Sequence, residues 1–405
     1  MISRRLLIAA AAGTAIAFSA GLAAAQTVVG VTDTEIKIGN TNPYSGPASA
    51  YGTIGKGIKA YFAMINDQGG INGRKINFIS LDDGYSPPKT VEQIRRLVEQ
   101  EKVAFLFQTL GTPTNSAIHK YVNKKKVPHL FVATGATKWG QPKKFPWTMG
   151  WQPNYQGEGK IYAQYILDNL PNAKVGILYQ NDDYGKDYVK GLVDQLGAKA
   201  SSIVISKLPY ETSDPTVDSQ IVSLKNAGAN ILYNVTTPKF AAQAIRKAAD
   251  IGWKHTQFLN SVSNSVGSVL KPAGLDKSKG IISAFYLKDP TDPQWVNDAD
   301  YKAWTAWMDK YYPSGDKLSS FNAYAYAVAA TVTQVLKQAG NDLSRENIMK
   351  QAANLSNLTV PMLLPGIKIN TGANDFYPIE GMELGRFTGE KWELFGGVID
   401  PSKGS

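Results

Sequence analysis

The sequence contains no cysteine and only three histidines. Without cysteine, disulfide bonds, a thiol nucleophile and a thiolate metal site are all excluded. His119, His129 and His255 do not stand at the H-x-x-x-H or H-E-x-x-H spacing that places two zinc ligands on one helix face, and we expect no metal site. A chain of 405 residues buries a sizeable core without disulfides, and its length favours two domains or lobes.

Common catalytic motifs are missing as well. There is no G-x-S-x-G segment, so a hydrolase of that type has no nucleophile. The segment Gly52-Thr53-Ile54-Gly55-Lys56-Gly57 lacks the Ser/Thr of a phosphate loop and has the wrong glycine order for dinucleotide binding. We interpret the carboxylate pair Asp82-Asp83 as turn or capping residues before Pro87. The sequence therefore predicts a protein that is not an enzyme and needs no cofactor.

The first 25 residues have the layout of a secretory signal peptide. Arg4 and Arg5 precede an apolar run, Leu6–Leu22, which ends in Ala23-Ala24-Ala25 before Gln26. The run is short and Ala-rich for a membrane anchor, the alternative reading. We predict cleavage after Ala25 and a periplasmic location, and leave the export route (Sec or twin-arginine) open.

The net charge of +10 raises the question of nucleic-acid binding. The basic residues are scattered, and the one tight cluster, Lys124-Lys125-Lys126, stands where a helix is expected to end and the helix dipole favours cations. We therefore expect no nucleic-acid partner.

Strand-like and helix-like segments alternate after the signal. Short runs rich in β-branched residues, such as Val103–Leu110 and Val127–Thr134, predict strands, and stretches such as Thr114–Lys125 between them predict helices. This alternation predicts an α/β protein with doubly wound, mostly parallel sheets. The run Val103-Ala104-Phe105-Leu106-Phe107 is apolar throughout, which is typical of a sheet covered on both faces.

The alternation falls into two sets, followed by a helical block. We predict a first lobe of residues 27–146 plus 280–358 and a second lobe of residues 147–279 plus 359–402. The helical segments Trp295–Tyr312, Ser319–Gly340 and Ser344–Ala353 should pack on the first lobe. The strand-like pieces Gly366–Asn370 and Met382–Phe387 should complete the second.

Two neighbouring strand ends carry hydroxyls and glycines. Val103–Leu110 is followed by Gly111-Thr112, and Val127–Thr134 by Gly135-Ala136-Thr137. Ligands of doubly wound sheets sit beyond these carboxyl ends, where hydroxyls and free backbone N–H groups bind anions. The two threonines equally fit simple helix caps. A carboxylate site and a pair of caps both remain open at this point.

The sequence resembles the branched-chain amino acid (leucine/isoleucine/valine) type of solute-binding proteins of ABC transporters. The similarity covers nearly the whole chain after the signal. Its most specific marker is the Gly69-Gly70-Ile71-Asn72-Gly73 turn downstream of Ser45-Gly46-Pro47, followed in order by Asp82-Asp83, Gly135-Ala136-Thr137 and Asp183-Tyr184-Gly185. The resemblance implies a type I periplasmic-binding fold, with two lobes joined by three crossovers and closing by hinge motion. It also implies a monomer that works with membrane permease and ATPase subunits.

The resemblance further implies a set of ligand-binding residues. The first lobe would hold a carboxylate through Thr112, Ala136 and Thr137, next to Gly111 and Gly135. Aromatic and second-lobe contacts would come from the following residues: Tyr51, Trp151, Tyr184, Thr236, Ser261 and Val262.

One departure from this family affects the expected ligand. Relatives that bind amino acids place an acidic side chain near the strand predicted at Gln257–Ser261, whereas here the segment Asn260–Asn264 has no Asp or Glu. A buried ammonium without a partner costs several kcal/mol. We therefore expect a small carboxylate ligand without an ammonium group, such as an aromatic acid. The alternatives are a branched-chain amino acid and a ligand-sensing module.

Overall fold

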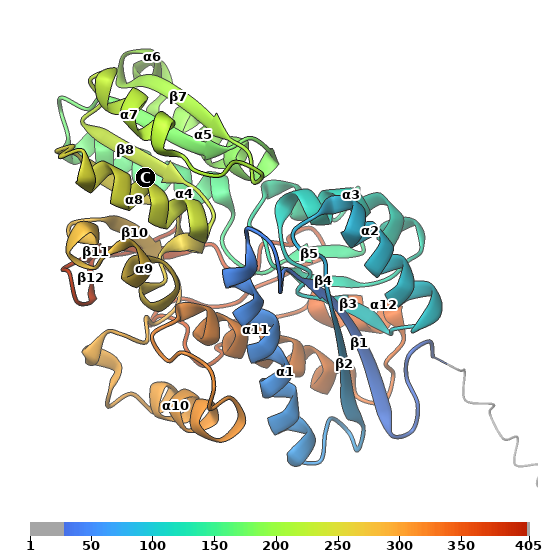
Figure 1. The fold of residues 1–405 in the computed structure, drawn as a ribbon. Helices are drawn as coiled ribbons and strands as arrows, with labels where there is room; N and C mark the ends of the chain where they lie inside the picture. The colour runs from blue at the N-terminus through green and yellow to red at the C-terminus, as the bar shows by residue number, and fades with distance from the viewer. Residues whose placement is uncertain (1–27, 403–405) are drawn as a thin grey trace, which may run out of the picture.

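The computed structural model describes residues 28–402, so the predicted signal peptide lies outside the described part of the chain. The chain forms two lobes, each built on one sheet with helices on both faces (Figure 1). The predicted α/β class with two mostly parallel sheets is confirmed.

The first lobe contains a five-stranded sheet in which every neighbouring pair is parallel. Its strands, in spatial order, are β2 (Lys75–Asp82), β1 (Glu35–Asn42), β3 (Phe105–Phe107), β4 (His129–Val132) and β5 (Thr148–Gly150). Every residue of β3 and β4 is buried, as expected for a sheet covered on both faces.

The second lobe contains a seven-stranded sheet that is parallel except at one edge. Its strands, in spatial order, are β12 (Trp392–Ile399), β11 (Met382–Phe387), β10 (Ile282–Phe285), β9 (Thr256–Leu259), β8 (Ile231–Val235), β6 (Val175–Gln180) and β7 (Val204–Tyr210). Strand β11 runs antiparallel to both of its neighbours. The C-terminal hairpin thus closes the edge of a sheet that is otherwise parallel.

Helices cover both sheets. Those of the first lobe are α1 (Gly52–Asp67), α2 (Pro87–Arg95), α3 (Thr112–Lys124), α10 (Ala299–Tyr311), α11 (Ser320–Ala339) and α12 (Arg345–Ala352). Those of the second lobe are α4 (Tyr155–Asn169), α5 (Asp183–Leu196), α6 (Ala200–Ile203), α7 (Asp218–Asn226), α8 (Pro238–Asp250) and α9 (Lys271–Ala273). No helix of residues 28–402 is both long and apolar enough to span a membrane.

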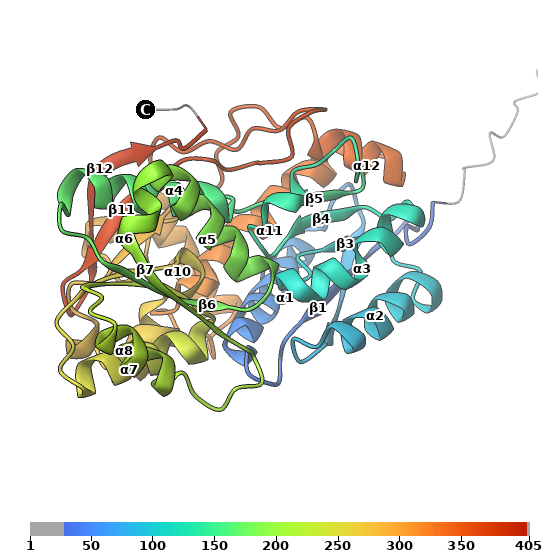
Figure 2. The same cartoon turned by 90° about the horizontal axis from the view of Figure 1, so that it is seen from above.

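The helical block near the C-terminus packs on the first lobe, as predicted. Tyr61 of α1 lies 5.1 Å from Tyr326 of α11, and Trp307 of α10 lies 4.9 Å from Tyr326, measured between ring centroids. Such aromatic pairs contribute beyond the area they bury. The segment after α12 then runs back along the molecule to β11 and β12 in the second lobe (Figure 2).

The chain crosses between the lobes three times, but two of the predicted boundaries are wrong. Strand β5, placed in the second lobe from the sequence, pairs with β4 in the first sheet. Strand β10, placed in the first lobe, pairs with β9 and β11 in the second. Both strands are short, and their pairing partners, which the local sequence does not reveal, decide the lobe to which each belongs.

The predicted strand Gly366–Asn370 does not form a ladder. Leu358 and Ile369 make only an isolated bridge, and Gly366 has a φ of +86°, outside the extended region. Strand Met382–Phe387, in contrast, has the predicted bounds.

Candidate ligand-binding site

A cavity lies between the two lobes, beyond the carboxyl ends of their strands. The empty space among its walls is about 790 Å³, including the part open to solvent, within the range of small-molecule sites. The lining residues used below are Tyr51, Tyr85, Gly111, Thr112, Gln152, Tyr155, Tyr184, Thr237, Ser261, Val262, Asn264, Phe285, Tyr286, Lys288, Asp289, Ser320, Phe321 and Tyr324.

The first lobe presents the N-terminus of α3 to this cavity. Thr112 is the first residue of the helix and is 1 % exposed, and its hydroxyl lies 2.6 Å from the hydroxyl of Thr134. The first N–H groups of a helix have no partner within the helix and favour an anion, and here Thr112 and Thr114 carry such groups whereas Pro113 between them has none. Gly111 has a φ of +101°, and an added Cβ would lie 2.5 Å from the Tyr85 ring, so only glycine fits here.

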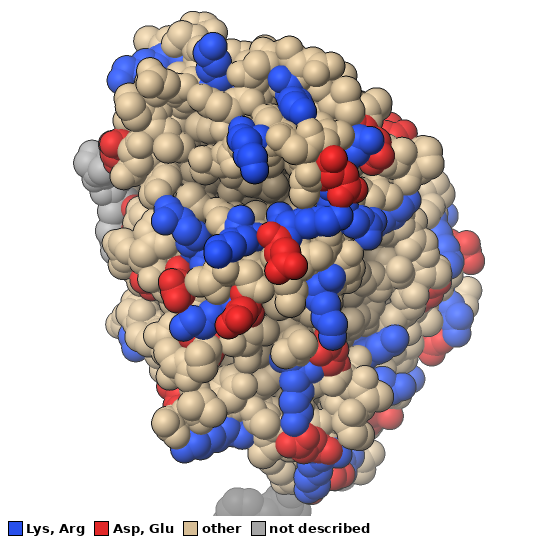
Figure 3. All heavy atoms as spheres, turned by 60° about the vertical axis from the view of Figure 1, so that its left-hand side comes forward, with Lys and Arg blue, Asp and Glu red and all other residues tan. Residues whose placement is uncertain are grey.

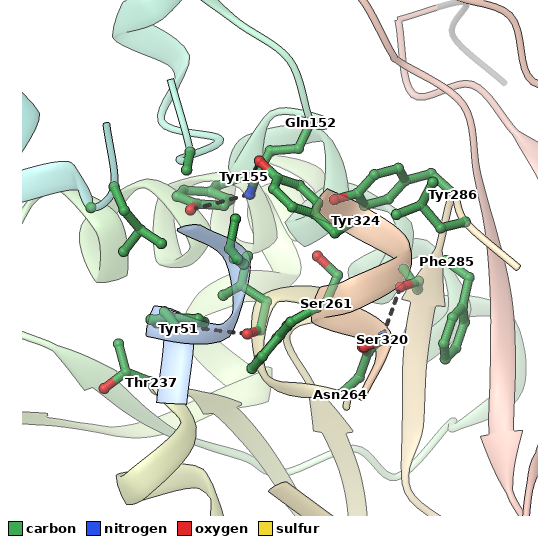
Figure 4. A pocket seen from close by; sticks show the side chains of 18 of the residues that line it. Tyr51, Gln152, Tyr155, Thr237, Ser261, Asn264, Phe285, Tyr286, Ser320 and Tyr324 are labelled. Atoms are coloured by element: carbon green, nitrogen blue, oxygen red, sulfur yellow. Dashed lines mark hydrogen bonds between the residues drawn. The ribbon is translucent and has the colours of Figure 1, made fainter. Parts of the chain in front are cut away.

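Aromatic rings form most of the remaining wall (Figure 4). Tyr51 lies 5.2 Å from Phe321, and Tyr155 lies 5.4 Å from Tyr184, measured between ring centroids. Burial raises the pKa of Tyr51 and of Tyr184 well above the usual value, so both phenols stay protonated. Flat apolar walls with a few phenol groups suit a ligand with an apolar body.

Hydrogen bonds join the lobes around the cavity. The Tyr51 hydroxyl, from the first lobe, donates to the Val262 carbonyl of the second at 3.0 Å. At the rim Lys138 forms an ion pair with Asp183 at 2.6 Å. These contacts hold the two lobes together around the cavity.

Six of the residues expected from the sequence line this cavity: Tyr51, Gly111, Thr112, Tyr184, Ser261 and Val262. Thr137 was expected to hold a ligand carboxylate, but it is not among the lining residues and bonds to a carboxylate of the protein. Its N–H and its hydroxyl donate to the Asp187 carboxylate at 2.7 and 2.8 Å. Asp187 belongs to α5 of the second lobe, so Thr137 joins the lobes outside the cavity lining.

Four further expected residues also lie outside the lining. Ala136 is buried beside Thr137, and Gly135 packs against Tyr155, whose ring would be 2.7 Å from an added Cβ. Trp151 lies behind the wall, 5.1 Å from the Tyr324 ring. The Thr236 hydroxyl bonds to Asn234, and Thr237 lines the cavity in its place.

The pair Asp82-Asp83 holds the turn after β2, as the sequence suggested. Asp82 accepts from the Ser45 hydroxyl at 2.6 Å and from the Gly84 N–H at 3.0 Å. Asp83 accepts from the Tyr85 N–H at 3.0 Å and so fixes the loop that brings the Tyr85 ring to the cavity.

Glu158 is a buried acid that no sequence pattern connected with the site. It reaches from α4 to the back of Ser261 and accepts from the Ser261 N–H and hydroxyl at 2.7 and 2.6 Å. The hydroxyls of Tyr162 and Tyr188 donate to it as well, at 2.8 and 2.7 Å. Burial raises the pKa of Glu158, and these four donors oppose that shift. With both oxygens occupied, Glu158 orients Ser261 and has no acceptor left for a ligand.

The residues at the end of the cavity that the second crossover forms were also not predicted from the sequence. There the chain leaves β10 and contributes Phe285, Tyr286, Lys288 and Asp289. In Figure 4 Phe285 and Tyr286 lie on the opposite side of the cavity from Tyr51. Lys288 and Asp289 are the only charged residues in the lining.

No group of three or more His, Cys, Asp or Glu residues within residues 28–402 is placed to hold a metal ion.

On the face shown in Figure 3, Lys and Arg side chains form a band with Asp and Glu interspersed.

Two lobes closing on an internal cavity define a hinged binding protein. The sequence matches the periplasmic binding protein family over residues 35–391, and the chain belongs to this family. It is a family of binding proteins, so the prediction that the chain is not an enzyme is confirmed.

Relatives with assigned names are similar over most of the chain. A Leu/Ile/Val-binding protein homolog 1 from Brucella abortus (strain 2308) is 28 % identical over 333 residues, which cover 80 % of this chain and 84 % of the relative. An amino acid binding protein from Pseudomonas aeruginosa is 22 % identical over 316 residues, covering 76 % and 79 %. The resemblance drawn from the sequence is therefore confirmed at the level of the family.

Solved structures share the fold. A branched chain amino acid ABC transporter protein from Thermus thermophilus with bound valine superposes with a TM-score of 0.81 at 14 % identity, covering 91 % of this chain and 97 % of that one. A fatty acid ABC transporter substrate-binding protein from Thermomonospora curvata gives 0.79 at 20 % identity, covering 94 % and 96 %. At these identities the match establishes the fold alone, and the two neighbours are described with different ligands.

Proposed function

We propose that the chain is the periplasmic solute-binding component of an ABC uptake transporter and captures a small carboxylate ligand that has an apolar body and no ammonium group, such as an aromatic acid. The observation that supports this proposal is the set of residues that line the cavity. The N-terminus of α3 with Thr112 offers an anion site at one wall, and aromatic rings make up most of the others.

The charge distribution of the lining argues against an ordinary amino acid. In an α-amino acid the ammonium stands on the carbon next to the carboxylate, so a carboxylate bound at Thr112 would keep the ammonium close to the same wall. The uncharged residues Tyr51, Tyr184 and Ser261 offer no counter-charge, Glu158 is fully occupied behind Ser261, and Asp289, the acid in the lining, belongs to the crossover after β10. A buried ammonium without a partner costs several kcal/mol.

A ligand screen tests the proposal. Thermal-shift measurements followed by calorimetry would compare benzoate and cinnamate with leucine and valine. A carboxylate that binds the closed lobes stabilises the fold by mass action, about 2.7 kcal/mol at a hundred times its Kd. Stabilisation by leucine or valine, with none by the aromatic acids, would reject the aromatic-acid class.

The second candidate is a branched-chain amino acid. It is supported by the names of relatives that are 26–28 % identical over about four-fifths of the chain. The same screen separates the two candidates, because it contains both ligand classes under one set of conditions.

The transport role has its own test. In proteoliposomes that contain the permease and ATPase subunits, the liganded protein should stimulate ATP hydrolysis, and unliganded protein should do so less. A ligand-sensing role would instead predict no stimulation by either form. Light scattering would check the expected monomer.

A further inference from the structure

Asp289 is a buried carboxylate with one oxygen left unpaired. Its Oδ1 accepts from the Thr291 N–H at 2.9 Å and from the Thr291 hydroxyl. Its Oδ2 is buried and has no hydrogen-bond partner among the described residues. Asp289 is 5 % exposed, and burial raises its pKa to about 6. Leaving a buried acceptor without a hydrogen-bond partner is energetically unfavourable, and more so when the group is charged.

The neighbouring cation does not satisfy this oxygen. The Lys288 ammonium is directed to two other carboxylates, Asp298 at 2.8 Å and Asp300 at 3.2 Å, and lies over the Trp295 ring. Because Lys288 is committed in this way, the unpaired oxygen of Asp289 calls for a donor from elsewhere. Asp289 lines the cavity, so a ligand is in a position to supply one.

Asp289 and Thr112 come from different parts of the fold. Thr112 begins α3 in the first lobe, whereas Asp289 lies in the crossover after β10, beyond Phe285 and Tyr286. These two aromatic residues lie across the cavity from Tyr51 in Figure 4. The anion site and the unpaired acceptor are thus supplied by different elements of the fold, in a cavity lined largely by aromatic rings.

We propose that Asp289 is a specificity-determining residue that accepts a hydrogen bond from a donor at the far end of the ligand, so that the preferred solute is a hydroxyaryl carboxylic acid. This inference rests on the proposed function and narrows its ligand class. The carboxylate lies at Thr112, the aromatic ring lies among the tyrosines, and the phenol hydroxyl donates to Asp289. Leucine and valine do not fit this arrangement, because they carry no donor at the end remote from their carboxylate.

Calorimetry with 4-hydroxycinnamate and cinnamate tests the inference, since these acids differ only by the hydroxyl. The wild-type protein should bind the hydroxylated acid about tenfold more tightly or better, as expected for a hydrogen bond to a charged acceptor. In Asp289→Ala the ratio of the two affinities should fall to about one. Asp289→Asn preserves the shape of the side chain and removes its charge, so it should lower the ratio even if the alanine variant is unstable.

Asp292→Asn is the matched control. Asp292 is also buried and caps the same crossover, where it accepts from the Gln294 N–H at 3.0 Å, but it does not line the cavity. This variant should keep the wild-type affinity ratio. Equal binding of the two acids by the wild-type protein, or a ratio unchanged in both Asp289 variants, would overturn the inference alone. Binding of neither acid would overturn the proposed aromatic-acid ligand together with the inference.

Discussion

The contact between Thr137 and Asp187 should control how readily the lobes close. Asp187 of α5 accepts the Thr137 N–H at 2.7 Å and its hydroxyl at 2.8 Å, and Gln156 of its own lobe donates to it at 2.5 Å. When the lobes separate, the two hydrogen bonds from Thr137 break. The hydrogen bond from Gln156 remains, because Gln156 and Asp187 belong to the same lobe. Asp187→Ala therefore removes an interaction that exists only in the closed form.

The size of the effect follows from those two bonds. A hydrogen bond to a charged group contributes about 1.5–3 kcal/mol when buried, and this site is only partly buried, so we take about 2–3 kcal/mol for the pair. That range lowers the closing equilibrium constant about 30- to 150-fold. Ligand affinity falls by the same factor as long as the open form predominates without ligand.

Calorimetry on Asp187→Ala measures the loss of affinity for whichever acid the screen identifies, and small-angle scattering measures the fraction of closed protein. The control is Asp194→Ala, on the same helix, which removes only an exposed pair with Lys190 worth a few tenths of a kcal/mol. Affinity within threefold of the wild type for Asp187→Ala, with closure unchanged, would refute the argument.

Three further predictions concern single side chains. Tyr51→Phe removes the bond to the Val262 carbonyl and should weaken ligand binding about two- to tenfold by calorimetry; unchanged affinity would show that this bond does not favour closure. Burial lowers the pKa of His129 to about 3, below its unfolded value of about 6.5, so the unfolded state binds the extra proton. The free energy of unfolding in urea should then fall as the pH drops from about 6.5 towards 3, and His129→Gln should flatten this dependence; identical pH profiles would contradict the assignment. Glu158→Ala leaves the Ser261 N–H, the Ser261 hydroxyl and the Tyr188 hydroxyl without their acceptor, whereas the Tyr162 hydroxyl keeps the Leu259 carbonyl at 2.9 Å. The variant should lower the free energy of unfolding by about 3 kcal/mol or more, and a loss below 1 kcal/mol would contradict the network.

The fold was predictable because its signals are local. The run Val103–Phe107 is apolar throughout and buried, and its last three residues form β3. Pro87 and Pro238 begin helices, as proline does at a first turn. The lobe membership of β5 and β10 was not predictable in the same way. A strand of three or four residues has the same pattern in either sheet, and only its pairing partners decide where it belongs.

The acidic residues of the site show a similar limit. The segment around Asn260 contains no Asp or Glu residue of its own. The carboxylate behind Ser261 is nevertheless supplied by Glu158, about a hundred positions away, and a second carboxylate reaches the cavity from Asp289 in a crossover. Both contacts join residues that are far apart in the sequence and depend on how the helices and crossovers pack. No local sequence motif therefore predicts them.

Thr112 and Thr137 were both predicted to bind the ligand carboxylate because each carries a hydroxyl shortly after a buried strand. In the structure the two residues have different partners. Thr112 faces the cavity, whereas Thr137 meets a carboxylate that α5 brings from the other lobe. Replacing each with valine removes a hydroxyl and keeps the volume, so both variants should bind more weakly. Only Thr112→Val should reduce the preference for a free acid over its uncharged amide, because only Thr112 lies at the proposed anion site. Thr137→Val should weaken acid and amide equally, through closure. Calorimetry with cinnamate and cinnamamide separates these outcomes, and a loss of acid preference in Thr137→Val would return that residue to the ligand site.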